Sequence, residues 1–388
     1  MDITGIICEY DPLHLGHKKQ IDHIRQNEPN MGIVCLMSGN FVQRGKPALI
    51  DKSLRAKAAI LTGADLVLEM PVTASLSSAE NFASTGVKIL GDFCSHLSFG
   101  AETADESILL SLAKVLLSAE FSSALSKTLE QGLSFPAARQ KALENMGFPG
   151  HILSLPNNIL AVEYCKAIIS QKSQLTPSPI LRGGNYHDSL PDSENPSATA
   201  VRNIMLNQKN WSAYVPEPVR AIYTNAPLHA LCAGETAVLG KLRSMSEESF
   251  SQLPYGSEGL WRKLMRSVQN EASLDAILSA TKSKRYTRSR LDRMVMCAFL
   301  GFTESQLLNP VPYVRVLALN DRGREILKRA REHGCFPNTG EKMDDPYQII
   351  ENRCGDLYGL FALNGPEKPG QEQIRRVYYK RGDHHDCQ

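Results

Sequence analysis

Short apolar runs alternate with amphipathic segments along the first half of the chain. Four runs have the length and composition of buried strands, at residues 3–8, 32–37, 64–69 and 96–99. The intervening segments show helical spacing of their apolar positions, at residues 15–25, 51–62 and 75–90. This alternation predicts a doubly wound, Rossmann-like α/β domain, in which ligands bind where the carboxyl ends of parallel strands lead into helices.

Helical patterns dominate the rest of the chain. Three helices are predicted at residues 104–118, 121–147 and 157–170. A strand with a turn follows at 177–188, and a surface loop at 189–198. From Trp211 the strand signal fades, and RVLALNDRGREILKRAREHG predicts a short strand or helix start followed by an amphipathic helix. We therefore expect an α/β catalytic domain over residues 1–210 and a mainly α-helical C-terminal domain over 211–388.

Composition narrows the picture only slightly. With 42% hydrophobic residues and a formal net charge of +2, the 388-residue chain resembles a globular protein whose nucleic-acid surface, if present, must be a local basic cluster. The nine cysteines include no C-x-x-C pair, so we expect neither zinc nor disulfides, and a cytoplasmic location. We expect no signal peptide and no membrane span, and a solvated end at 384–387.

The stretch EYDPLHLGH follows the first predicted strand and leads into a helix. A helix N-terminus attracts an anion, Gly16 lets a phosphate approach the backbone, and the imidazoles of His14 and His17 can donate hydrogen bonds to its oxygens. Glu9 is a carboxylate that a strand end does not require, and positive charge follows at Lys18 and Lys19. These parts suit phosphoryl or nucleotidyl transfer, with an ordinary polar turn as the alternative.

Other nucleotide and hydrolase motifs are excluded. GNFVQRGK, residues 39–46, resembles a P-loop but has one residue too many between its glycines and a proline where Ser or Thr is needed. No G-x-G-x-x-G follows a strand, which leaves dinucleotide redox chemistry without support. The absence of H-E-x-x-H and G-x-S-x-G removes the metalloprotease and α/β-hydrolase interpretations.

A second element, SATAVR at residues 197–202, strengthens the nucleotidyl-transfer interpretation. Its hydroxyls and Arg202 stand at a predicted helix start, where they suit a triphosphate, although Ser197 as a simple helix N-cap is the alternative. Together with H-x-G-H it resembles the HIGH-motif nucleotidyltransferase superfamily, whose second motif is S-S-T-x-I-R.

Several longer blocks resemble one family within that superfamily. EYDPLHLGH, MSGNFVQRGKPALIDKSLRA, GADLVLEMP, LSFGAE, PNNILAVEY and KRYTRSRLDR look like the bacterial tRNA(Met) cytidine acetate ligases, in the same order and over most of the chain. The resemblance implies that ATP and acetate give acetyl-AMP and pyrophosphate. The acetyl group then passes to N4 of the wobble cytidine of elongator tRNA(Met), forming N4-acetylcytidine.

The resemblance also implies an ATP site. The first loop contributes Ile7, Cys8, Glu9, Tyr10, Asp11, Pro12, Leu13, His14, Leu15, Gly16, His17, Lys18, Lys19 and Gln20. Later segments contribute Gly100, Asn157, Arg182, Ser197, Thr199 and Arg202.

The first loop departs from the family pattern E-Y-N-P-F-H-N-G-H at three positions. Asp11 replaces Asn, Leu13 replaces Phe and Leu15 replaces Asn, while Gln20 stands where a third His is common. Arg182 lies one residue closer to YHD than the pattern implies. These departures bear on the adenosine contacts and leave the H-x-G-H motif intact.

Roles follow as hypotheses for the activation step. His14 and His17 are expected to bind the phosphates and neutralise the developing charge, and pyrophosphate is expected to be steadied by Lys19, Lys52, Arg55 and Arg202. A solvated helix face is the alternative for the second and third of these. Mg²⁺ is expected on the ATP phosphates, because no dedicated carboxylate cage is present. An acetate pocket is guessed at Ser38, Gly39 and Asn40.

A basic segment, KSKRYTRSRLDR at residues 282–293, predicts an RNA surface. Six basic residues oppose one acidic residue, giving a local charge of +5. A helix is predicted from about Thr287, so Arg288 and Arg290 oppose its dipole, which stability alone would not select. Phosphate contact and base stacking would, and the expected tRNA contacts are Lys282, Lys284, Arg285, Tyr286, Arg288, Arg290 and Arg293. A solvated basic face is the alternative.

Two other functions remain open at this stage. One is an adenylyltransferase that acts on a phosphorylated small metabolite, against which the long, locally basic second half speaks. The other is a non-catalytic RNA-binding protein, against which the intact H-x-G-H and SATAVR motifs speak. Oligomeric state is not encoded in any of these patterns.

Overall fold

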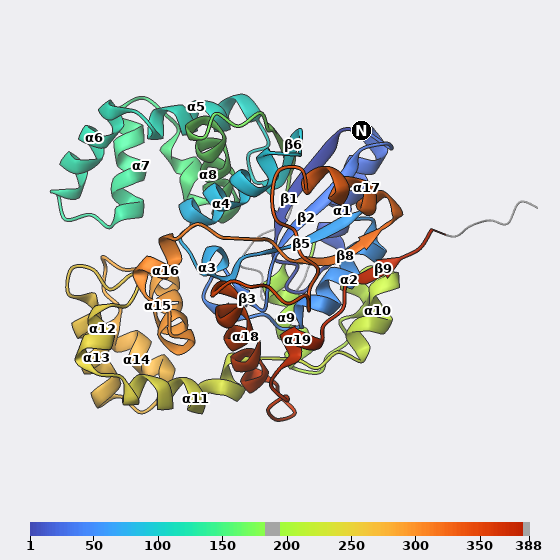
Figure 1. The fold of residues 1–388 in the computed structure, drawn as a ribbon. Helices are drawn as coiled ribbons and strands as arrows, with labels where there is room; N and C mark the ends of the chain where they lie inside the picture. The colour runs from blue at the N-terminus through green and yellow to red at the C-terminus, as the bar shows by residue number, and fades with distance from the viewer. Residues whose placement is uncertain (183–194, 383–388) are drawn as a thin grey trace, which may run out of the picture.

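A central sheet of seven strands organises the protein (Figure 1). The computed structural model describes residues 1–182 and 195–382. The strand order is β7–β6–β1–β2–β5–β8–β9. The bounds along the chain are β1 Ile3–Cys8, β2 Gly32–Ser38, β5 Leu66–Met70, β6 His96–Ala101, β7 Thr176–Leu181, β8 Val316–Asn320 and β9 Tyr378–Lys380.

The first five of these strands in chain order run parallel. β1 pairs with β2 and β6, β2 pairs with β5, and β6 pairs with β7, all in parallel register. Helices cover both faces, which is why β2 is buried along its whole length and its sequence is almost entirely apolar. The predicted doubly wound α/β fold is confirmed, and the carboxyl ends of β1, β2, β6 and β7 meet at one edge of the sheet.

The helices of the first half connect and flank these strands. Their bounds are α1 Leu15–Asn27, α2 Lys52–Thr62, α3 Val72–Ser75, α4 Ala79–Gly91, α5 Glu106–Leu116, α6 Ala119–Leu129, α7 Phe135–Asn145 and α8 Pro156–Ser170. A hairpin of β3 Phe41–Val42 and β4 Lys46–Pro47 lies between β2 and α2. The helix predicted at 121–147 is two helices, because Gly132 adopts a left-handed φ of 76° between them.

The second half is mainly helical, as predicted. Its helices are α9 Ala198–Leu206, α10 Glu217–Thr224, α11 Leu231–Ser244, α12 Glu247–Ser251, α13 Leu260–Asn270, α14 Leu274–Thr281, α15 Arg288–Leu300, α16 Glu304–Leu308, α17 Asp321–Ala330, α18 Tyr347–Tyr358 and α19 Gln371–Ile374. Helices α11 to α15 enclose an apolar core that includes Leu242, Leu264 and Met294. They form the lower left of Figure 1, and α5 to α7 the upper left.

Two strands from the second half extend the sheet of the first. β8 pairs antiparallel with β5, and β9 pairs parallel with β8. The run VLALN is therefore a strand, which settles the choice between strand and helix start. The division at residue 210 stays a prediction, and the chain crosses it to place β8, α17 and β9 against the α/β layer.

Two further expectations concern membrane-spanning helices and the segments predicted to be solvent-exposed. Within the described ranges no single helix is long and apolar enough to span a membrane, although α5 and α6, bent by 73°, meet the length and composition test as a pair. Most of the loop predicted at 189–198, and the tail at 384–387, lie outside the described residues.

Candidate active site

The histidines of EYDPLHLGH form the N-terminal cap of α1. Nδ1 of His14 accepts a hydrogen bond from the Gly16 N–H at 3.1 Å, and Nδ1 of His17 accepts one from the His14 N–H at 3.3 Å. The two rings stack with centroids 3.8 Å apart. Because each Nδ1 is an acceptor, each neutral ring carries its proton on Nε2. The His14 Nε2 is buried and has no hydrogen-bond partner among the described residues, so its donor is left unused by the protein there.

Both imidazoles are neutral near pH 7. Burial lowers the pKa of His14 well below its usual value, aided by His17, Arg182 and Arg202. Burial and Arg182 lower the pKa of His17 to about 3. Each histidine is therefore a neutral hydrogen-bond donor, and the positive charge at this place comes from the neighbouring arginines.

Residues from β6, β7 and α8 meet beside the histidines. Nη1 of Arg182, which follows β7, donates to Oδ1 of Asn157 at 3.2 Å. Asn157, in the first turn of α8, donates its Nδ2–H to Oε1 of Glu102 at 2.8 Å. A Cβ on Gly100 would lie 3.7 Å from Cδ of Arg182. The structure thus brings Gly100, Asn157 and Arg182 together.

The SATAVR element starts α9. Ser197 caps the helix, its hydroxyl accepting from the Ala200 N–H at 3.2 Å, which is the structural alternative that the sequence left open. Arg202 reaches across to the first loop and donates to the main-chain oxygen of Asp11 and, at 3.3 Å, to its carboxylate. Nη2 of Arg202 donates to Oγ1 of Thr199 at 3.1 Å. Arg202 therefore ties the two predicted motifs together.

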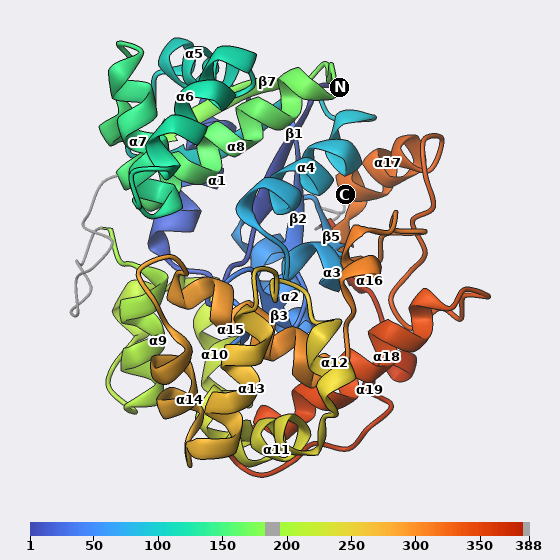
Figure 2. The ribbon, with the colours of Figure 1, turned by 90° about the vertical axis from the view of Figure 1, so that its left-hand side faces the viewer.

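The starts of α1 and α9 adjoin. A Cβ on Gly16 would lie 3.7 Å from the Pro196 carbonyl oxygen, and Nζ of Lys19 donates to Oδ1 of Asn195 at 2.9 Å. Figure 2 shows α1 between α8 above and α9 below. Two helix N-termini at one place give a concentration of N–H groups and positive potential that favours a polyanion.

The remaining apolar residues of the first loop form its support. Tyr10 has a left-handed φ of 47° and is buried, with its hydroxyl 3.5 Å from Sγ of Cys35. The Leu13 N–H donates to the Tyr223 hydroxyl at 3.0 Å. Ile7 and Pro12 are buried, while Cys8 and Leu15 are half-buried. This support lets the polar groups of the loop stay in place without a ligand.

Two polar loop residues have partners on or beside α1. Nζ of Lys18 contacts Asp22 at 2.6 Å across one helical turn. Nε2 of Gln20 donates to Oγ of Ser98 on β6 at 3.1 Å. These contacts position the first turns of α1 relative to β6, and the expected ATP contacts of the two side chains stay predictions.

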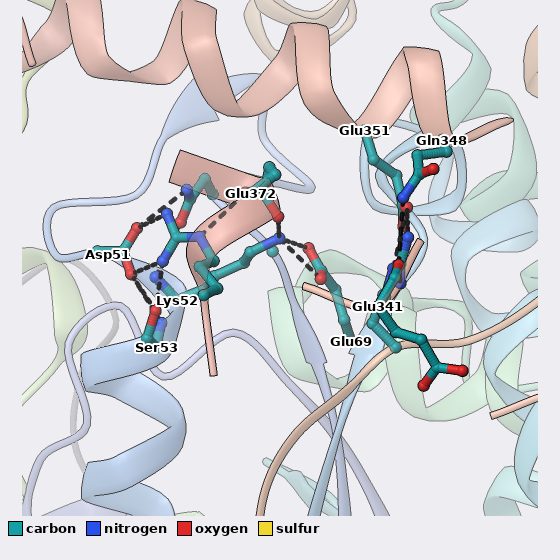
Figure 3. Close-up of polar contacts among 12 residues, drawn as sticks. Asp51, Lys52, Ser53, Glu69, Glu341, Gln348, Glu351 and Glu372 are labelled. Carbon is teal, nitrogen blue, oxygen red and sulfur yellow. Dashed lines mark hydrogen bonds and ion pairs between the residues drawn. The ribbon is translucent and has the colours of Figure 1, made fainter. Parts of the chain in front are cut away.

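Lys52 lies in a buried cluster of ion pairs. Its Nζ is buried between Oε1 of Glu69 at 2.7 Å and Oε2 of Glu372 at 2.8 Å (Figure 3). Arg375 contacts both Asp51 and Glu372 in the same cluster. The solvated alternative is wrong, because α19 and the residue after it return to cover the start of α2. The expected contact with pyrophosphate stays a prediction, and the two ion pairs give it no support.

Arg55 is also structural. Its side chain is 0% exposed, and its guanidinium donates to four main-chain oxygens, those of Glu9, Ser38, Gly39 and Ile50. It thereby joins the ends of β1 and β2 to the start of α2. The solvated alternative for Arg55 is therefore wrong, and its expected contact with pyrophosphate stays a prediction that these hydrogen bonds do not support.

The guessed acetate pocket is partly occupied by this structural network. Asn40 donates to Asp51 at 3.1 Å, and a Cβ on Gly39 would lie 2.3 Å from Oε1 of Glu69. Ser38 is buried, and its Oγ has no partner among the described residues. The pocket stays a prediction, in which Ser38 is the residue with an uncommitted polar atom.

The basic segment joins α14 to α15, and α15 starts at Arg288 with Thr287 as its cap. Arg288 lies between Asp275 at 2.9 Å and Asp292 at 3.2 Å, so part of its charge is compensated. Arg290 donates to the Tyr255 carbonyl oxygen at 2.9 Å. Local partners therefore account for some of the arginines that the helix dipole disfavours.

The other members of the segment divide into exposed and buried side chains. Lys282, Lys284 and Arg285 are exposed, and the half-buried Tyr286 lies under the guanidinium of Arg290 at 5.0 Å. Arg293 is buried, with its guanidinium 5.2 Å from the Tyr255 ring centroid. α15 turns this position inward, so the expected tRNA contact of Arg293, which stays a prediction, has no support from its exposure.

Sequence reasoning missed two residues that hold the site. Glu102 anchors the start of α8, and it lies in the block LSFGAE, two positions after the predicted Gly100. Gln43 donates its main-chain N–H to Oε1 of Glu9 at 2.7 Å from the β3–β4 hairpin, and no pattern signals a main-chain contact of this kind.

Comparisons with known proteins agree with this architecture. The family model described as HIGH Nucleotidyl Transferase matches residues 1–363. The tRNA(Met) cytidine acetate ligase of Clostridium acetobutylicum is 38% identical over 97% of this chain and 99% of its own length, and that of Clostridium tetani is 35% identical over 98% and 100%.

Solved structures with a similar fold include two of one protein. The apo structure of Thermotoga maritima TmcAL superposes with a TM-score of 0.88 at 27% identity, covering 98% of this chain and 100% of that one. A second structure, of Thermotoga maritima TmcAL bound with alpha-thio ATP, gives a TM-score of 0.86 at 27% identity with the same coverage. The chain therefore belongs to the tRNA(Met) cytidine acetate ligases of the HIGH nucleotidyl transferase family.

Proposed function

We propose that this protein is an ATP-dependent ligase that activates acetate as acetyl-AMP and transfers the acetyl group to N4 of the wobble cytidine of elongator tRNA(Met). The observation that carries the proposal is the buried Nε2 of His14, which has no hydrogen-bond partner in the described part of the chain and lies where two helix N-termini meet, near two arginines. We infer the substrates from the names of the relatives and the type of reaction from the residues of the site.

In the activation step, an acetate oxygen attacks the α-phosphorus and pyrophosphate leaves. His14 and His17 donate their Nε2–H groups to phosphate oxygens, and Arg182, Arg202 and Lys19 supply charge that stabilises the transition state. No group of three or more His, Cys, Asp or Glu side chains within the described ranges is arranged to hold a metal. We therefore place Mg²⁺ on the ATP phosphates and water rather than in a protein cage.

In the transfer step, the cytidine amine attacks the acyl carbon and AMP leaves. The proposed contact with the tRNA consists of the exposed Lys282, Lys284 and Arg285, the half-buried Tyr286, and Arg288 and Arg290. A tRNA substrate, and cysteines that are scattered along the chain without C-x-x-C pairs, support a cytoplasmic location.

Two measurements test the proposal. Acetate-dependent exchange of labelled pyrophosphate into ATP tests activation, and its absence with every short carboxylate would overturn adenylate formation. Mass analysis of nucleosides from tRNA incubated with ATP and acetate tests transfer. N4-acetylcytidine is expected. A dinucleotide-like product formed from a phosphorylated metabolite, without acetyl-AMP, would instead identify an adenylyltransferase.

A further inference from the structure

Glu9 is a carboxylate in a fixed position, and the activation step proposed above gives its side chain no role. It directly follows β1, and its Oε1 accepts a hydrogen bond from the Gln43 N–H at 2.7 Å. Its own main-chain oxygen accepts a hydrogen bond from Arg55. Side chain and backbone are therefore held by two different neighbours, and the carboxylate is half-buried at the end of the central strand.

The neighbour that holds the carboxylate belongs to a hairpin packed on α15. The Gln43 carbonyl oxygen accepts from Nη1 of Arg293 at 3.4 Å. Gly45 has a φ of 74°, and a Cβ there would lie 2.4 Å from the Arg293 backbone nitrogen, so hairpin and helix are in close contact. Gln43 therefore links Glu9 to α15, the helix whose first turn holds the proposed tRNA contacts Arg288 and Arg290.

Other carboxylates near the site have both oxygens engaged. Oδ1 of Asp11 accepts from the Leu49 N–H at 2.7 Å and Oδ2 accepts from Arg202 at 3.3 Å. Both oxygens of Glu102 accept bonds from the first turn of α8. The second oxygen of Glu9 makes no hydrogen bond with any described residue, and a lone negative charge beside a triphosphate weakens its binding. Glu9 therefore needs a role other than holding ATP.

The charged groups around Glu9 set its proton affinity. Facing it are Asp11 on its own loop, Arg44 on the hairpin, Arg202 on α9 and Tyr164 on α8. Burial, with a smaller contribution from Asp11, raises the pKa of Glu9, against the opposing effects of the Gln43 N–H and the two arginines. A carboxylate with a raised pKa is a stronger base near neutral pH.

We propose that Glu9 is the catalytic base of acetyl transfer, an inference that rests on the proposed function. The lone pair of a cytidine N4 amine is delocalised into the ring, so attack on the acyl carbon needs a partner that removes its proton. As the N–C bond forms, the C–O bond to AMP breaks and AMP leaves with the electron pair. The N4 proton passes to the free oxygen of Glu9, which then returns it to water.

The test compares the two half-reactions in Glu9→Gln. Glutamine keeps an oxygen to accept the Gln43 N–H and removes only the base. We expect single-turnover transfer from preformed acetyl-adenylate to an elongator tRNA(Met) transcript to fall about 100-fold or more. Acetate-dependent pyrophosphate exchange should fall by much less, about tenfold or under. Equal losses in both reactions, or no loss in transfer, would overturn the inference.

Control variants and pH profiles sharpen the result. Glu80→Gln makes the same change at an exposed ion pair on α4, and both of its rates should stay within about twofold. Wild-type transfer should decline as pH falls through the raised pKa of Glu9. Glu9→Asp should keep that decline and Glu9→Gln should lack it. A wild-type transfer rate that shows no decline towards acid pH contradicts the proposal even if the glutamine variant does not fold.

Two further outcomes separate this inference from its foundation. If the wild-type protein acetylates no tRNA, the proposed function fails. If the wild type is active and Glu9→Gln transfers equally well, only the role of Glu9 fails. Recovery of both half-reactions in Glu9→Gln at high Mg²⁺ would assign the carboxylate to metal binding and overturn its role as a base.

Discussion

Arg55 offers a direct test of the distinction between a structural and a substrate-binding cation. Replacing it with alanine leaves four main-chain oxygens without their donor, at Ile50, Glu9, Ser38 and Gly39. A buried acceptor that loses its partner costs about 1–3 kcal/mol. Taking the low end, since a carbonyl can retain or recruit another donor, Arg55→Ala should reduce the free energy of unfolding by about 4 kcal/mol.

That loss is large against a typical stability of about 5–15 kcal/mol. Urea unfolding followed by circular dichroism measures it, with pyrophosphate exchange recorded on the same samples. Arg55→Lys is the matched control, because it keeps the charge but has fewer donors in a different geometry, and it should still destabilise the protein. The reasoning is refuted if Arg55→Ala unfolds at the wild-type urea concentration and loses only its affinity for pyrophosphate.

Three further predictions follow from the site and its surroundings. Burial and the neighbouring carboxylates raise the pKa of Glu69 to about 7 despite the opposing ammonium group, so the folded state holds a proton that the unfolded state has released. The free energy of unfolding should therefore decrease as pH rises through about 7 in urea titrations, and a wild-type-like decrease in Glu69→Gln would contradict this. Gly16→Ala places a Cβ 3.0 Å from the His14 ring, so acetate-dependent exchange should fall at least tenfold at near-wild-type stability, whereas unchanged exchange would show that the ring position is unimportant. Reversing the charges of Arg288 and Arg290 should lower the salt slope of tRNA binding by about 2 in filter-binding assays and spare exchange, and an unchanged slope would move the RNA surface elsewhere.

Local patterns were sufficient for the parts of the protein that depend on neighbouring residues. The apolar run that became β2 identifies a strand buried on both faces, and the H-x-G-H pattern identifies the start of α1, where His14 is the N-cap and Gly16 and His17 lie in the first turn. In both cases the relevant interactions lie within a few positions along the chain, so residue types and their spacing were enough. The order of motifs then placed Gly100, Asn157 and Arg182 at one edge of the sheet.

Cations on helix faces were not predictable in this way. Lys52 and Arg55 have the spacing of a solvated or substrate-facing stripe on α2, yet both are buried. The partner that covers Lys52 is Glu372, which is 320 positions away along the chain. Burial of a charged side chain depends on which remote segment returns to pair with it, and helical spacing carries no record of that segment.

The way in which the second half of the chain packs on the first was also decided by tertiary contacts. β8 and β9 join the sheet through non-local main-chain pairing, for which a short apolar run gives no partner. Arg293 and Gln43, far apart in the chain, meet where the hairpin packs on α15 and fixes the carboxylate of Glu9. Side-chain chemistry could thus be read along the chain, whereas the orientation and burial that give each group its task came from packing, because they depend on distant backbone atoms as well as on side chains.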